Sequence, residues 1–160
     1  MINKDWLFSD DNSVCGFRSV GVLVHNGKIL VQRDKDGTEY ALPGGHIKVG
    51  ETAEMSIIRE YKEETGADIV CDRMIWIDES FWKCGKKDAH TIAFYFLVSL
   101  QNSTDIPDNG EFFSQKDNCD VILGWIPIDE LGTITVYPTY LKDKITNIAD
   151  GIEHFVYTEQ

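Results

Sequence analysis

Runs of apolar residues, some continuous and some alternating with polar ones, predict most of a β-sheet along this chain. Residues 20–24 and 28–32 read as two strands on either side of Asn26-Gly27. Asn-Gly between apolar runs is a strong hairpin signal, because a type I′ turn requires positive φ at both central residues. The same patterns predict further strands at residues 40–42, 69–81, 91–100, 121–128 and 152–157.

A helix is expected over residues 52–65, with Gly66 as a left-handed C-terminal cap. Its side chains divide into an acidic strip and a neighbouring apolar face made of Ile57, Ile58 and Tyr61. An amphipathic helix of this kind can pack on a sheet with one face while its polar edge stays accessible.

A second helix is expected to begin at Pro138, a residue suited to the first turn of a helix. Leu141, Ile145 and Ile148 are spaced i, i+4 and i+7 and form its apolar stripe, and Gly151 ends it. Strands on both sides of the first helix, with a second helix later, predict an α/β fold.

Size and composition are those of one globular domain spanning residues 1–160, with 42% hydrophobic and 26% charged residues. No apolar run is long enough to span a membrane, and the N-terminal residues lack the pattern of a secretory signal. We therefore expect a cytoplasmic protein with reduced thiols. Its cysteines, which show no C-x-x-C spacing, are Cys15, Cys71, Cys84 and Cys119.

The net charge of −12 narrows the choice of partners. Such a surface repels nucleic-acid polymers and anionic membranes. A small phosphate ester can still bind where a divalent cation screens the site. We expect a small phosphorylated nucleotide as the substrate, while a homodimer is left open.

Three glutamates of the first helix, Glu60, Glu63 and Glu64, fall at i, i+3 and i+4. That spacing places all three carboxylates on one face, where like charges repel. One interpretation is an ordinary solvated face, because glutamate is a good helix former. The other is a site for a hard cation such as Mg²⁺, which takes oxygen ligands from carboxylates and from substrate phosphates.

The residues around these glutamates favour the second interpretation. The pattern G-x5-E-x7-R-E-Y-x-E-E-x-G-A resembles the signature of the Nudix hydrolases, and its matching residues are Gly45, Glu51, Arg59, Glu60, Glu63, Glu64 and Gly66. Tyr61 and Ala67 depart from the family's preferences at packing positions. The resemblance implies an α/β/α sandwich around a mixed β-sheet.

The resemblance also implies roles for the matching residues. Glu60, Glu63 and Glu64 would hold Mg²⁺ or Mn²⁺, and Glu63 or Glu60, in that order of preference, would be the catalytic base. Arg59 would pair with Glu51 to lock the loop and helix together, although its position on the helix points it away from Glu60. Gly45, Glu51, Arg59 and Gly66 are then structural residues of the motif.

Residues 101–120 are the least ordered segment by composition, and we expect a mobile polar loop there. The family often takes one more metal-ligating acid from a late loop. Asp120 is the best placed by analogy, with Glu111 and Asp117 as alternatives, and each can equally be an ordinary surface acid.

The resemblance implies hydrolysis of a pyrophosphate bond in a nucleoside diphosphate linked to a group X. Markers of the ADP-ribose, diadenosine polyphosphate and coenzyme A subfamilies are absent, which leaves a nucleoside triphosphate or a nucleotide sugar. The alternative is a catalytically silent nucleotide-binding module on the same fold. Trp76, Phe81, Trp82 and Tyr95 could stack on a base, although aromatic residues in apolar strands more often pack in the core.

Overall fold

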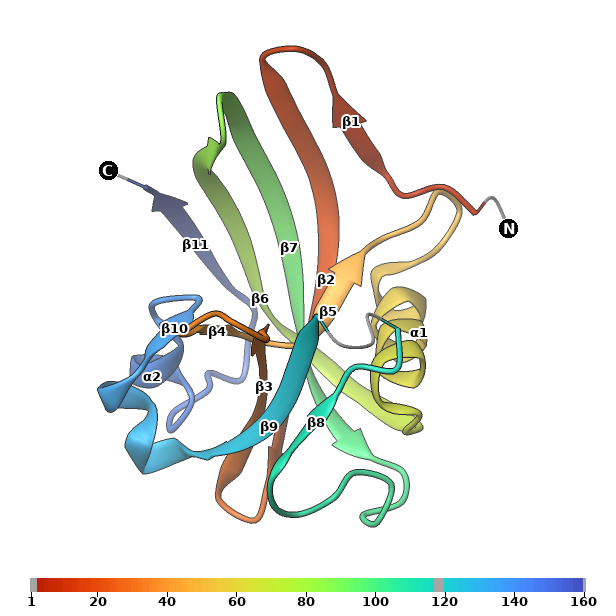
Figure 1. Ribbon diagram of the computed structural model, residues 1–160, viewed down its shortest axis with the longest axis vertical. Coiled ribbons are helices and arrows are strands. Elements are labelled where there is room, and N and C mark those ends of the chain that lie inside the picture. The colour runs from red at the N-terminus through yellow and green to blue at the C-terminus, as the bar shows by residue number, and fades with distance from the viewer. Residues whose placement is uncertain (1–2, 117–119, 160) are drawn as a thin grey trace.

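A mixed β-sheet crosses the whole molecule in the computed structural model, which describes residues 3–116 and 120–159. Along the main path the strand order is β10-β4-β3-β2-β7-β6-β11, and β1, β5, β8 and β9 pair at its sides (Figure 1). The strands are β1 (Leu7–Ser9), β2 (Ser13–His25), β3 (Lys28–Asp34), β4 (Glu39–Ala41), β5 (Gly44–His46), β6 (Ile69–Cys84), β7 (Lys87–Leu100), β8 (Glu111–Phe113), β9 (Val121–Pro127), β10 (Thr135–Tyr137) and β11 (Glu153–Thr158).

The predicted hairpin at Asn26-Gly27 is confirmed. His25 pairs with Lys28 across it, and the φ angles are 52° at Asn26 and 74° at Gly27. Both central residues are thus left-handed, as a type I′ turn requires. The β6–β7 hairpin is longer than predicted, because its ladder continues to Cys84 opposite Lys87.

The first helix, α1 (Ala53–Thr65), is confirmed at both ends. The Thr52 hydroxyl accepts a hydrogen bond from the Met55 N–H, and the N–H of Gly66, at φ 76°, donates to a carbonyl of the last turn. Ile57 and Tyr61 are fully buried, but Ile58 is 38% exposed. Ile58 therefore lies at the edge of the predicted apolar face, because one residue along a helix turns the side chain by about 100°.

The predicted second helix is reduced to one turn, α2 (Leu141–Lys144), and does not begin at Pro138. The apolar stripe is nevertheless right, since Ile145 is buried and Ile148 packs against the same cluster. Beyond this turn, Arg73 donates hydrogen bonds to the backbone carbonyls at 149 and 150, at 2.8 and 3.2 Å. These apolar side chains are buried without the longer helix that their spacing predicts.

Two apolar clusters lie on opposite faces of the sheet. Neighbouring residues of one strand divide between them: Val22 belongs to one cluster and Leu23 to the other, and Ile29 and Leu30 divide in the same way. Helix α1 covers the cluster that contains Leu23, while α2 and the 3-10 helix η1 (Ile128–Thr133) cover the other (Figure 1). The predicted α/β/α arrangement around a mixed sheet is confirmed.

The polar segment 101–120 contains more structure than its composition indicates. It contributes β8 to the sheet and buries Ile106, and Ser114 is also buried. Asp117 and Cys119 lie outside the described residues, and the mobility of the loop stays a prediction. Of the other cysteines, Cys15, Cys71 and Cys84 are free thiols.

None of the helices in the described part of the chain combines the length and the apolar character needed to cross a bilayer.

Candidate active site

The loop between β5 and α1 is joined to the sheet on both sides. Strand β5 pairs with β2, where Val20 faces Gly44 and Arg18 faces His46. Inside the interface, the hydroxyl of Ser19 on β2 donates a 2.7 Å hydrogen bond to the buried hydroxyl of Ser56 on α1. The helix that carries the three glutamates is therefore held at a definite place on the sheet.

Two glycines of β5 allow the chain to pass closely. A Cβ at Gly44 would collide with the backbone of Ser19, and one at Gly45 would collide with the carboxylate of Glu60. Glycine at position 45 leaves the space in which the Glu60 carboxylate lies, 2% exposed, against the backbone of β5. The motif glycine thereby places a buried anion beside β5.

Arg59 is the central cation of the acidic face. Its Nε and Nη2 bind both oxygens of Glu51 at 2.7 and 2.9 Å, which is the pairing that the resemblance implies. Its Nη1 also contacts Glu60 at 2.6 Å and Glu63 at 3.2 Å. The expectation that Arg59 points away from Glu60 is wrong, because a long side chain can turn along the helix surface. These carboxylates raise the pKa of Arg59, although its burial opposes the shift.

Glu51 is held as an anion by the same contacts. One of its oxygens accepts a 2.9 Å hydrogen bond from the backbone N–H of Lys48 in addition to the Arg59 pair. Burial alone would raise the pKa of Glu51, but the hydrogen bonds from Arg59 and Lys48 outweigh it, and the pKa is lowered. Glu51 thus links the loop and α1 through a buried charged pair.

Lys116 is the residue of this site that the sequence pattern did not reveal. It comes from the loop after β8, and its Nζ lies 2.8 Å from Glu60 and 3.4 Å from Glu63. Partial burial would lower the pKa of Lys116, but the two carboxylates raise it. The preceding Gln115 attaches this loop to the end of α1, because its backbone N–H donates to the carbonyl of Glu64 at 2.8 Å.

The donor set suits a hard divalent cation. Glu60 and Glu63 both contact Arg59 and Lys116, so their oxygens face common points. Glu64 lines the same pocket of about 270 Å³ together with Glu60 and Gly45. Among residues 3–116 and 120–159, no three histidine, cysteine or acidic side chains converge as a finished metal site. Carboxylate oxygens are nevertheless the ligands that Mg²⁺ prefers.

The candidate acids of the late loop are placed differently. Glu111 binds Arg33 with both oxygens at 3.1 Å. Asp120 is exposed, and its backbone carbonyl accepts a 2.8 Å hydrogen bond from the N–H of Lys35. Asp117 lies outside the described residues. A metal-ligating role for Asp120 stays a prediction.

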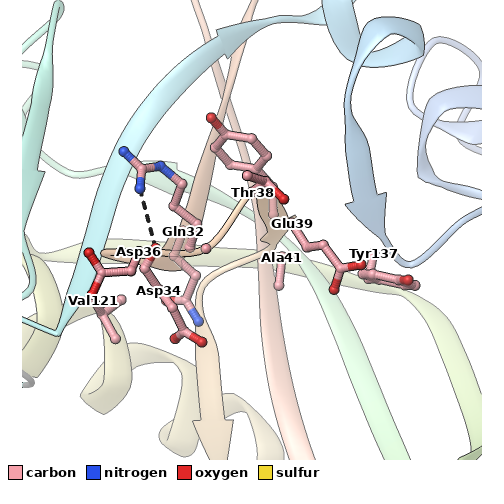
Figure 2. A pocket seen from close by; sticks show the side chains of 11 residues that line it. Gln32, Asp34, Asp36, Thr38, Glu39, Ala41, Val121 and Tyr137 are labelled. Carbon is pink, nitrogen blue, oxygen red and sulfur yellow. Dashed lines mark hydrogen bonds between the residues drawn. The ribbon is translucent and has the colours of Figure 1, made fainter.

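A second hollow adjoins the acidic pocket between β3 and β4 (Figure 2). It measures about 500 Å³ and shares Gln32 and Val121 with the acidic pocket. Asp34, Asp36 and Glu39 also line it, and Figure 2 shows Glu39 beside Tyr137. Acids in this number make the hollow a poor place for a phosphate anion.

Comparisons with known sequences place the chain in a family. Residues 17–145 match the NUDIX domain family. The chain is 32% identical over 114 residues to a mutator-type protein of Mycobacterium tuberculosis, MutT4, covering 71% of this chain and 42% of the relative. It is 28% identical over 148 residues to an NAD-capped RNA hydrolase, NudC, of Vibrio atlanticus, covering 90% of this chain and 49% of the relative. The chain thus spans less than half the length of these curated relatives.

Solved structures agree on the fold. A Nudix hydrolase from Nitrosomonas europaea superposes with a TM-score of 0.63 at 12% identity, covering 94% of this chain and 82% of that one. An ADP-ribose pyrophosphatase from Streptococcus suis gives 0.58 at 19% identity, covering 88% and 97%. These structures show the fold. The family match over residues 17–145, with the acidic helix and its paired arginine, shows that the chain belongs to the Nudix hydrolase family.

Proposed function

We propose that this protein hydrolyses a pyrophosphate bond in a nucleoside diphosphate linked to a group X, with the acidic face of α1 as its catalytic site. The observation that carries the proposal is the pair of carboxylates, Glu60 and Glu63, which converge on the same two cations, Arg59 and Lys116, beside a glycine-lined pocket. A diphosphate is an anion, so it needs cations in such a pocket. A divalent cation is the smallest group that can satisfy both carboxylates and phosphate.

The three glutamates of α1 would hold Mg²⁺ or Mn²⁺. When bound, such an ion neutralises phosphate charge and makes nearby water more acidic. Arg59 would then keep Glu60 and Glu63 oriented, since it contacts both through one nitrogen. The carboxylates therefore need little rearrangement to bind a cation.

Glu63 is the stronger candidate for the general base. Its side chain is 36% exposed, whereas that of Glu60 is 2% exposed. Arg59 and Lys116 contact both carboxylates, but they lie closer to Glu60, at 2.6 and 2.8 Å, than to Glu63, at 3.2 and 3.4 Å. A base must reach the attacking water and must release its proton again. As water attacks phosphorus, Glu63 would accept the proton, and the bond from phosphorus to the bridging oxygen breaks.

The substrates of the relatives are starting points for the choice of X. One solved neighbour is a UDP-X diphosphatase and another an ADP-ribose pyrophosphatase. A nucleoside triphosphate or nucleotide sugar fits a chain with net charge −12 better than a nucleic-acid polymer does. We expect a cytoplasmic enzyme that acts on small nucleotides.

A panel assay tests this function. Purified protein with Mg²⁺ is offered dNTPs, nucleotide sugars, ADP-ribose, NADH, dinucleoside polyphosphates and an NAD-capped RNA, and the phosphorylated products are identified. We expect cleavage of a small nucleotide at a pyrophosphate bond, and loss of that cleavage in Glu63→Gln or without metal. Glu54→Gln is the matched control, because Glu54 is an exposed acid in the first turn of the same helix.

A silent binding module is the alternative. In that case no panel member is cleaved, while a nucleotide still raises the melting temperature of the protein. The three retained glutamates, and the contacts of Glu60 and Glu63 with Arg59, favour the enzyme.

A further inference from the structure

A row of paired residues crosses the sheet and ends at the acidic site. Asp78 on β6 pairs with Ala93 on β7, which pairs with Arg18 on β2, which pairs with His46 on β5. Residues directly opposite one another in a sheet point to the same face. Because Ala93 is small, the face between Asp78 and Arg18 is left open.

A pocket of about 480 Å³ is lined by both Asp78 and Arg18. Its volume lies in the range of small-molecule sites in proteins, which is about 300–1,000 Å³. The pocket has aromatic walls, supplied by Trp82, Tyr95, Tyr137, Tyr140 and Tyr157.

Some of the aromatic residues named above pack in the core, and others line this pocket. Trp76 is fully buried and belongs to the core, and Phe81 stacks on His90. Trp82, by contrast, is 42% exposed at the pocket, and Tyr137 is 38% exposed. Large flat side chains that line an open pocket are suited to stacking on a planar ligand.

The buried carboxylate of the pocket, Asp78, favours a ligand that donates hydrogen bonds. Asp78 is 2% exposed; in the described chain the hydroxyl of Ser80 donates a hydrogen bond to it, and the hydroxyl of Tyr140 interacts with the same carboxylate. A carboxylate with free lone pairs accepts hydrogen bonds and donates none. Burial raises the pKa of Tyr140 and that of Tyr95, and the charge of Asp78 adds to both shifts. Both phenols therefore stay protonated at neutral pH.

Arg18 joins this pocket to the acidic site. Its side chain lines both the aromatic pocket and the pocket that contains Glu60 and Glu64. Among the residues that the structure describes, its guanidinium makes one long hydrogen bond, 3.5 Å, to the carbonyl of Gly44. An anion that passes from one pocket to the other therefore meets a cation with donors to spare.

We propose that the aromatic pocket holds the base of the nucleotide, that Asp78 selects guanine, and that Arg18 binds the phosphates between the pocket and α1. Guanine presents two adjacent N–H donors, the ring imino group and the exocyclic amino group, to one carboxylate. Adenine and cytosine present an acceptor nitrogen beside their amino group, and uracil presents carbonyls on both sides of its N–H. Either arrangement sets lone pairs against Asp78. The inference rests on the proposed function only in placing the diphosphate beside Glu60.

Binding without metal tests the inference apart from hydrolysis. GDP, ADP, CDP and UDP are titrated into the full chain in EDTA, followed by calorimetry and by tryptophan fluorescence. We expect GDP to bind at least about tenfold tighter than the other three. Asp78→Asn should remove that preference, while Glu79→Gln should keep it, since Glu79 points to the opposite face and binds His154.

Two further variants separate the roles and guard against misfolding. Arg18→Gln should weaken GDP binding but leave guanosine binding nearly unchanged, because only the phosphates are affected. Tyr140→Phe keeps the ring and removes a hydroxyl near Asp78, so it should weaken GDP and guanosine alike even if Asp78→Asn fails to fold.

Equal affinity for the four nucleotides would overturn the inference, as would a guanine preference that survives both Asp78→Asn and Tyr140→Phe. If a nucleotide sugar binds through its sugar in this pocket, the variants will weaken it whatever its base, and the assignment to guanine is wrong. Hydrolysis of a nucleotide without base preference would refute this inference and leave the proposed function standing.

Discussion

Glu60 and Asp78 are equally buried carboxylates in opposite surroundings. Glu60 on α1 contacts two cations, Arg59 and Lys116, whereas Asp78 on β6 receives a hydrogen bond from the neutral Ser80. A buried charge needs compensation, and each site supplies it by a different means. The Glu60 site suits the replacement of one cation by another. The Asp78 site suits a neutral group that donates hydrogen bonds.

This difference gives the two sites separate tasks in the proposed reaction. In the proposed function, the acidic face of α1 determines which bond is broken, because metal ions held there would act on the diphosphate. The aromatic pocket determines which nucleotide reaches it, because stacking and hydrogen bonds discriminate between bases. Arg18 lines both, so the two tasks meet at one side chain.

The sharpest way to break the comparison is to neutralise each carboxylate without changing its shape. Glu60→Gln should lower kcat by about a hundredfold or more, because it removes a charge that the reaction uses. GDP affinity in EDTA should stay nearly unchanged in this variant. Steady-state kinetics and calorimetry measure the two effects. A Glu60→Gln protein that turns over normally would show that the acidic face is not the reaction centre.

The second prediction concerns stability at the charged site. Glu51→Gln should lower the free energy of unfolding by about 3 kcal/mol, because it leaves the partly buried guanidinium of Arg59 without its bidentate partner. Urea denaturation at neutral pH measures the change. Glu54→Gln, an exposed acid of the same helix, should change it by less than about 0.5 kcal/mol.

The same pair predicts a pH dependence of defined sign. Since the pKa of Glu51 is lowered from its ordinary 4.5, the ion pair stabilises the folded state fully above pH 4.5. That stability is lost as the pH falls through the folded pKa. The difference between wild type and Glu51→Gln should therefore be constant near neutrality and shrink below pH 4.5. A difference that grew on acidification would contradict this account.

A side chain placed against the Glu60 carboxylate should lower the free energy of unfolding by less than the Glu51→Gln replacement does. Gly45→Ala places a methyl group against its carboxylate, so we expect a loss of about 1–3 kcal/mol in stability together with reduced turnover. Gly132→Ala is the matched control, since a Cβ there meets no atom within 4 Å. Equal melting temperatures for both variants would mean that Glu60 can move away freely.

The smallest expected effect sharpens the role of Lys116. Lys116→Gln removes a half-exposed cation that competes for Glu60 and Glu63, so the half-saturating Mg²⁺ concentration should fall by less than about fivefold. Direct Mg²⁺ titration measures it. Lys62→Gln should leave it unchanged, because Lys62 pairs with Asp68 instead.

Local patterns predicted the parts of the fold that depend on local chemistry. The turn at Asn26-Gly27 and the Gly66 cap follow from backbone conformations that few residues adopt. The length of α2 did not follow, because apolar spacing is satisfied equally by a helix or by a compact turn held by Arg73. Propensity is a weak guide where tertiary contacts decide.

Of the candidate site, too, one part could be predicted from the sequence and another could not. Glu51 and Arg59 meet as their spacing in the motif implies. Lys116, Arg18 and Asp78 come from distant strands and loops, and nothing in their neighbouring residues marks them. Arg18 and Asp78 line one pocket because of the register of β2, β7 and β6, which a single sequence does not determine. Lys116 reaches Glu60 from the loop after β8.

Gln115 connects the loop after β8 to the C-terminal end of α1. By donating to the carbonyl of Glu64 and, at 3.2 Å, to that of Thr65, it serves as the C-terminal cap of α1. The next residue along supplies the counter-charge of Glu60. A replacement in this loop can therefore affect α1 in two ways, through the hydrogen bonds of Gln115 to the end of the helix and through the charge of Lys116 beside Glu60.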